Sequence, residues 1–158
     1  MRKRETWRDS AYSLDRDEED DGEFQRGLVF VGMAFDLPAD KSDVFQAVKH
    51  TCGELGLRAT RVDDRYDSGP IPVQVLKTIE DAEFLVFDLS TERPNVYYEL
   101  GYAHGIGNRS EEIVLIARSG SKLHFDIAQL RILFYDSAID LSQKLASMLQ
   151  RMIEATRK

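Results

Sequence analysis

The sequence predicts an α/β protein with one parallel sheet that helices cover on both faces. From residue 28 to the end of the chain, short apolar runs alternate with segments whose apolar residues recur at helical spacing. The apolar runs lack a polar face, which is typical of parallel strands buried on both sides. At 158 residues and 42% hydrophobic content, the chain is long enough for one domain with a sizeable core.

Five apolar runs are predicted to be strands. The second run carries two arginines and an aspartate, so we expect it to be the most exposed of the five. In chain order, the runs are LVFVG at 28–32, RATRVD at 58–63, EFLVFDL at 83–89, EIVLIA at 112–117 and RILFY at 131–135.

Four helices are predicted to separate and follow these strands, from apolar spacing and from end signals. Asp40 or Ser42 is expected to cap the first helix, and Asn95 the third. Prolines at the start of the second helix are compatible with its first turn. The predicted segments are 40–56, 70–82, 95–107 and 138–156.

Five strands joined in this way suggest a three-layer sandwich with the flavodoxin-like strand order 2-1-3-4-5. In an open parallel sheet, the ligand crevice lies beyond the carboxyl ends of the strands, where the connections diverge to opposite faces. We therefore expect a crevice between the first and third strands. The residues delivered there, and expected to bind substrate or act on it, are Gly32, Met33, Phe35, Asp63, Asp88, Ser90 and Asn95.

Composition excludes several other functions. The formal net charge of −7 gives no electrostatic footprint for polymeric DNA or RNA. There is no apolar run of about eighteen residues and no signal-peptide pattern, so a soluble, cytoplasmic protein without a membrane partner is expected. The single cysteine, Cys52, and three scattered histidines indicate neither a disulfide framework nor a metal site.

An acidic run, DRDEEDDGE, occupies residues 15–23 and contains no apolar residue. Such a run cannot bury enough surface to offset the entropy of ordering, and its charges repel one another. We expect residues 1–26 to form a disordered acidic tail and residues 27–158 to form the folded domain.

Glu99 stands out because its helix neighbours are apolar or aromatic, and burying a carboxylate is costly. It falls about one turn after the predicted helix start, so its side chain can lean back toward the crevice. Asp88, which ends a central strand, can reach the same region. Two carboxylates in different surroundings can do acid, base or nucleophilic work, and one aimed at a sugar C1′ supports cleavage or transfer of an N-glycosidic bond. The alternative is structural: the helix dipole favours Glu99, and Asp88 accepts local backbone hydrogen bonds.

Several segments resemble the nucleoside 2-deoxyribosyltransferase-like proteins and their TIR-like relatives, in matching order. They are FVGMAFD at 30–36, RVDD at 61–64, IEDAEFLVFDLSTERPNVYYELGYAHG at 79–105 and FDIAQLRILFYD at 125–136. The resemblance implies that Glu99, in the Glu-Leu-Gly motif, attacks the sugar C1′. It also implies a nucleoside pocket shaped by Asp88, Gly32, Met33 and Phe35. TIR-like relatives use an equivalent glutamate to release nicotinamide from NAD, often in bacterial immunity to phage.

The predicted function is thus an N-glycosidase or N-glycosyl transferase acting on a nucleoside, nucleotide or NAD-like substrate through Glu99, with Asp88 as second catalytic residue. An anti-phage effector is one form this could take. The alternative is a non-catalytic module of the same fold, either a sensor that binds a nucleotide as a signal or an interaction protein whose site is vestigial. We expect no cofactor, with NAD only as a substrate. We also expect a homo-oligomer and, for an effector, a separate sensor protein.

Overall fold

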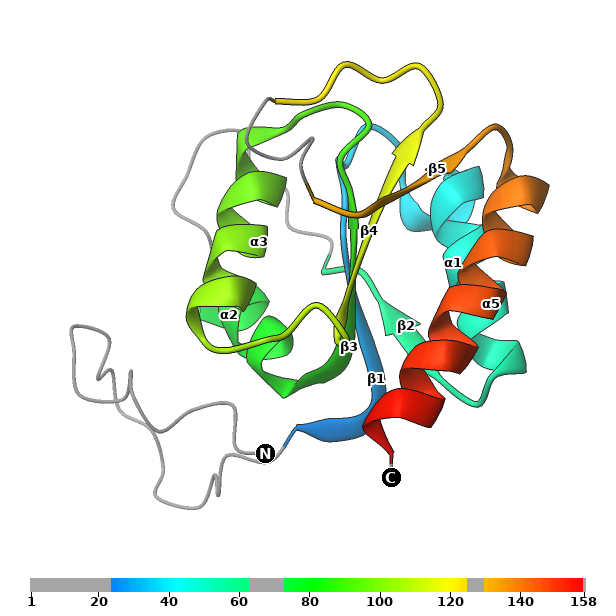
Figure 1. Ribbon diagram of the computed structural model, residues 1–158. Helices are drawn as coiled ribbons and strands as arrows, with labels where there is room; N and C mark the ends of the chain where they lie inside the picture. Colours follow the sequence, from blue (N-terminus) through cyan, green and yellow to red (C-terminus); the bar gives the residue numbers. More distant parts are fainter. Residues whose placement is uncertain (1–23, 63–72, 125–129, 158) are drawn as a thin grey trace.

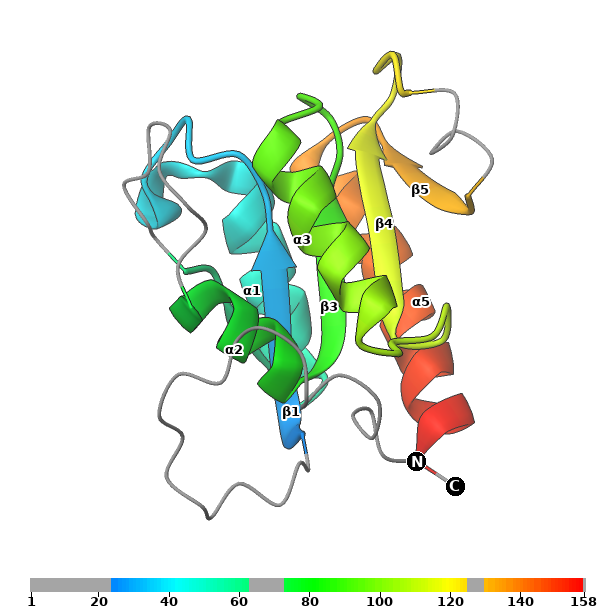
Figure 2. The same cartoon turned by 90° about the vertical axis from the view of Figure 1, so that its left-hand side faces the viewer.

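The computed structural model describes residues 24–62, 73–124 and 130–157, and over these residues it is a three-layer α/β sandwich (Figure 1). Five parallel strands form one sheet in the order β2-β1-β3-β4-β5. Helices α1 and α5 cover one face, and α2 and α3 cover the other (Figures 1 and 2). The flavodoxin-like order predicted from the sequence is confirmed.

Each predicted strand and helix has a counterpart, although several ends differ. The strands are β1 (Gln25–Gly32), β2 (Arg58–Thr60), β3 (Ala82–Asp88), β4 (Ile113–Arg118) and β5 (Ile132–Tyr135). The helices are the 3-10 turn η1 (Ala39–Lys41), α1 (Asp43–Glu54), α2 (Val73–Asp81), α3 (Pro94–Gly105) and α5 (Ala138–Thr156). None of the helices in the described part of the chain is long and apolar enough to span a membrane.

Side chains that alternate along the two central strands, β1 and β3, fill one apolar layer on each face of the sheet. Val31 and Val86 belong to the layer beneath α1 and α5. Phe30 and Phe87 belong to the layer beneath α2 and α3, with ring centroids 5.9 Å apart. Because both faces of these strands are buried, their sequences read as continuous apolar runs.

Local signals set the ends of α1. The Ser42 hydroxyl accepts a hydrogen bond from the Phe45 backbone N–H at 3.2 Å, so Ser42 is the cap and Asp40 is not. After the helix, Gly56 has a φ of 73°, a left-handed conformation that favours glycine and ends the helix where predicted.

Asn95 does not cap α3, so that prediction was wrong. The N-cap is Arg93, whose carbonyl accepts hydrogen bonds from the Val96 and Tyr97 N–H groups at 3.1 and 3.3 Å. Pro94 takes the first helical position, where its missing N–H has no cost and its fixed φ suits the helix. Asn95 therefore lies within the first turn and is exposed.

The bounds of the first two strands also differ from expectation. β1 begins at Gln25, so the last two residues assigned to the tail belong to the sheet; the remainder of that segment, residues 1–23, lies outside the described residues. β2 is partly exposed, as expected for an edge strand, but it ends at Thr60. Asp63, assigned to the crevice from the sequence, lies outside the described residues.

An ion pair joins Glu83, near the start of β3, to Arg157, the C-cap of α5. Both oxygens of Glu83 accept hydrogen bonds from the Arg157 guanidinium at 2.8 Å, and the Gly27 N–H also donates to this carboxylate. Burial raises the pKa of Glu83, but the hydrogen bonds from Arg157 and Gly27 outweigh it and hold the pKa below its ordinary value of 4.5. The charged carboxylate of Glu83 therefore links β3 both to the start of β1 and to the end of α5.

Candidate active site

Glu99 lies on the core-facing side of α3. The buried residues of this helix recur at helical spacing, and Glu99 is one of them at 7% exposure: Val96, Glu99, Leu100 and Ala103. The carboxylate is thus more deeply buried than a position at a pocket edge would require. A buried carboxylate is costly, so this placement depends on what surrounds it.

Gly32 makes room for that carboxylate. It ends β1 and is paired with Phe87 of β3. A Cβ on Gly32 would lie 2.5 Å from Cδ1 of Phe87 and 3.0 Å from Oε2 of Glu99. The phenyl ring and the carboxylate therefore meet over the backbone of Gly32, at the carboxyl end of the first strand. In this topology, a crevice is expected beyond this end of the strands.

Asp88 is held by a separate set of hydrogen bonds. Its Oδ1 accepts from the backbone N–H of Ser90 at 3.0 Å and from the Ser90 hydroxyl at 2.5 Å. Its Oδ2 accepts from the Tyr135 hydroxyl at 3.1 Å. Burial, followed by the charge of Asp88, raises the pKa of Tyr135 to about 12, so this hydroxyl keeps its proton at neutral pH.

The carboxylates of Asp88 and Glu99 lie near the carboxyl ends of the strands, on opposite faces of the sheet. Phe87 points into the layer beneath α3, and Asp88 follows it along β3, so the Asp88 side chain projects toward the other face. Its partner Tyr135 belongs to the layer beneath α1 and α5. A ligand that touches both Asp88 and Glu99 must therefore lie across the ends of the strands.

The other predicted binding residues are spread around this edge. Met33 is buried in the layer beneath α1, whereas Phe35 is 44% exposed in the loop that follows β1. Ser90 contacts Asp88 and also accepts a hydrogen bond from the backbone N–H of Arg118 at 2.8 Å. Asn95 is exposed near the start of α3.

Sequence reasoning missed three residues that hold this edge together: Arg61, Arg93 and Tyr135. Tyr135 is far from Asp88 along the chain. The only sequence signal for a place near the site was its position at the very end of an apolar run. Arg61 follows the second strand, and its guanidinium lies against two phenyl rings. In the sequence, Arg61 falls within the run predicted to be an exposed strand, and arginines are mostly exposed, so the pattern offered no sign of a buried arginine.

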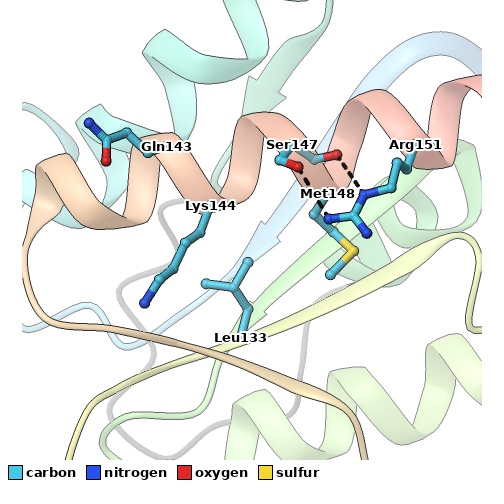
Figure 3. Close-up of a pocket in the computed structure, with 6 residues that line it drawn as sticks. All are labelled: Leu133, Gln143, Lys144, Ser147, Met148 and Arg151. Atoms are coloured by element: carbon cyan, nitrogen blue, oxygen red, sulfur yellow. Dashed lines mark hydrogen bonds between the residues drawn. The ribbon is translucent and has the colours of Figure 1, made fainter.

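A hollow of about 380 Å³ lies elsewhere, between β5 and α5 (Figure 3). It is lined by Leu133, Gln143, Lys144, Ser147, Met148 and Arg151, none of which is a predicted site residue. No carboxylate lines it, and the Lys144 ammonium is bonded to Asp140 and to the Phe134 carbonyl. We therefore do not assign the chemistry of the carboxylates to this hollow.

Other reactive groups lie away from the edge. Cys52 is fully buried in α1, and burial raises the pKa of its thiol to about 12, which removes it as a nucleophile. Among the described residues, no group of three or more His, Cys, Asp or Glu side chains is arranged to hold a metal ion. Glu99 and Asp88 remain the candidate groups at the carboxyl ends of the strands.

Fold and site together define a class: a parallel α/β protein of flavodoxin-like topology with a buried glutamate beside the end of its first strand. No family model matches the chain, and no curated protein matches its sequence. The structure is similar to that of the CMP N-glycosidase BcmB of Clostridium botulinum, with 15% identity and a TM-score of 0.54 over 75% of this chain and 96% of that one.

Two flavoproteins have a similar structure. A mutant flavo di-iron protein from Thermotoga maritima has 19% identity and a TM-score of 0.57 over 82% of this chain, which spans only 37% of that protein. A diflavin flavoprotein from Nostoc sp. has 13% identity and a TM-score of 0.51 over 85% of this chain and 95% of that one. At these identities the similarities show the fold, and the function is argued from the site.

Proposed function

We propose that this protein cleaves the N-glycosidic bond of a nucleoside, a nucleotide or an NAD-like molecule, with Glu99 as the nucleophile. The observation that carries the proposal is the position of the Glu99 carboxylate at the carboxyl end of the first strand, where Oε2 would lie 3.0 Å from a Cβ added to Gly32. The similarity of fold to a protein described as a CMP N-glycosidase supports the same class of substrate.

In the proposed reaction, Glu99 attacks C1′ of the sugar, and the electrons of the C1′–N bond leave with the base, which is protonated. The resulting glycosyl ester is then attacked by water or by another acceptor, which releases the sugar and restores the carboxylate. Asp88 has both oxygens bonded to Ser90 and Tyr135, so we assign it to orientation of the sugar through this network. The reaction needs no cofactor.

One observation favours a second function, the binding of a nucleotide as a signal without chemistry. The Asp88 carboxylate already accepts three hydrogen bonds from the protein, as a structural carboxylate does. Under this alternative, the edge of the sheet binds the same class of ligand and no base is released. Assembly into oligomers and coupling to a sensor protein belong to either function.

The test is replacement of Glu99 by glutamine. The amide is almost the same size as the carboxylate but is a poor nucleophile, so Glu99→Gln should abolish release of base and leave the circular dichroism spectrum unchanged. The matched control is Glu80→Gln, because Glu80 is equally buried on the same face of the sheet, at 7% exposure, and bonds Tyr102.

The substrates to be tried are NAD, nucleosides and nucleoside monophosphates, with released base measured by chromatography at high protein concentration. Unchanged turnover in Glu99→Gln would remove Glu99 from the mechanism. Binding of a nucleotide without any released base, measured by calorimetry on the unmodified protein, would support the signal-binding alternative.

A further inference from the structure

The loop after β1, residues 33–38, carries two exposed apolar side chains directly beside the candidate site. Phe35 is 44% exposed and Leu37 is 51% exposed. The loop begins next to Gly32 and reaches η1 without forming a strand or helix of its own. An exposed ring on such a loop keeps one orientation only if other side chains hold it.

Arg61, just beyond the end of β2, holds this loop from one side. Its guanidinium carbon lies 5.1 Å from the ring centroid of Phe35 and 5.4 Å from that of Phe45 in α1. Its Nη2 donates a hydrogen bond to the Leu37 carbonyl at 3.0 Å. One side chain therefore contacts both a ring and the backbone of the loop from a position between α1 and β2.

Arg61 is a charged residue, yet it is only 8% exposed. Burying a guanidinium costs free energy, and an apolar side chain of similar length would fill the same space at lower cost. An apolar side chain, however, cannot stack on a ring and donate to a carbonyl at the same time. The planar, always charged guanidinium does both, so the arginine orients the loop as well as filling the space.

Arg93 ties the same loop from the other side. Its Nη2 lies 2.7 Å from Oδ1 of Asp36, and both side chains are 54% exposed. An exposed ion pair contributes little to stability and weakens with salt, so Arg61 is the stronger of the two ties. Arg93 is also the N-cap of α3, the helix that carries Glu99. The two arginines thus hold the loop between β2 and the start of that helix.

We propose that Arg61 is a positioning residue, which holds the Phe35 ring in the orientation that stacks on the base of the substrate. This inference rests on the proposed function, because the exposed Phe35 ring lies on the loop that follows Gly32 at the candidate site. A ring held in place before binding loses less conformational entropy on binding. Arg61 is assigned no contact with the reacting atoms, so its loss should weaken binding, with a rise in KM of about tenfold and little change in kcat.

The first measurement reports the order of the ring without any substrate. Phe35→Trp in a Trp7→Phe background leaves one indole in the chain, at position 35, and time-resolved fluorescence anisotropy measures its motion. We expect fast indole motion to increase in Arg61→Met and in Arg61→Gln. The matched control is Arg58→Met, because Arg58 lies in β2, three residues before Arg61, and is exposed; it should leave the motion unchanged.

The second measurement is kinetic and keeps Phe35 in place. Arg61→Met should raise KM for the substrate found in the panel while kcat stays within about twofold, because Glu99 is untouched. Unchanged indole motion, a loss of kcat at constant KM, or unfolding of both Arg61 variants would overturn the positioning role. Absence of base release from the unmodified protein would instead overturn the proposed function, and the anisotropy would still report whether Arg61 orders the ring.

Discussion

Replacement of Gly32 by alanine tests the geometry on which the candidate site depends. The backbone of Gly32 is not in the left-handed region, so alanine is compatible with its φ and the effect of the change is steric. The new Cβ would lie 2.5 and 2.8 Å from Cδ1 and Cε1 of Phe87, and 3.0 Å from Oε2 of Glu99. Real Cβ atoms essentially never approach another atom as closely as the ring does here, so the ring must shift, whereas the carboxylate must give by only a few tenths of an ångström.

The size of the effect follows from where the ring lies. Phe87 is fully buried, so its ring cannot swing into solvent to relieve the contact. Overpacking of this kind costs about 1–3 kcal/mol of folding free energy. For a domain of this size, the loss corresponds to a fall in Tm of roughly 3–8 °C. Displacement of Glu99 by a few tenths of an ångström should also lower turnover, by less than the roughly 100-fold that a shift of about 1 Å can cost.

Urea and thermal unfolding measure the first effect, and release of base measures the second. The matched control is Gly53→Ala in α1, where an added Cβ meets no atom within 4 Å. That change should stabilise the protein by about 0.5–1 kcal/mol, because alanine favours a helix over glycine. In a Phe87→Leu background, the cost of Gly32→Ala should shrink, since leucine lacks the outer ring atoms. A Gly32→Ala protein as stable as the unmodified one would refute the proposed contact.

Three further changes test the hydrogen-bonded carboxylates. Arg157→Ala should cost about 2–3 kcal/mol in urea unfolding, somewhat below the ~3–5 kcal/mol of a fully buried pair, because Arg157 is partly exposed. The pKa of Glu83 is held below 4.5, so the contribution of the pair is present above about pH 4.5 and is lost as the pH falls through the folded value. Glu83→Gln should therefore flatten the acid side of the stability profile, and an unchanged profile would contradict the assignment. Tyr135→Phe removes the donor to Oδ2 of Asp88 and should cost about 1–2 kcal/mol by the same measurement, while equal stability would show that water replaces the hydroxyl.

Most of the fold could be predicted from local patterns. The central strands are apolar on both faces, so their runs and their parallel arrangement were visible in the sequence. The cap at Ser42, the stop at Gly56 and the span of α5 also follow from neighbouring residues. The error at Asn95 has a local cause as well, because Pro94 competes for the first turn and moves the cap to Arg93.

The sequence by itself determined the fold class, the strand order and the unusual position of Glu99 in an apolar helix. Only the tertiary structure decided where that carboxylate lies: it and the Phe87 ring both border the space above Gly32, which a Cβ would fill. The partnership of Asp88 with Tyr135 and the stacking of Arg61 on the loop after β1 were decided in the same way. These contacts join residues that are distant along the chain, and strand register and helix packing set their distances. Periodicity and capping report only on near neighbours, so they carry no record of such contacts.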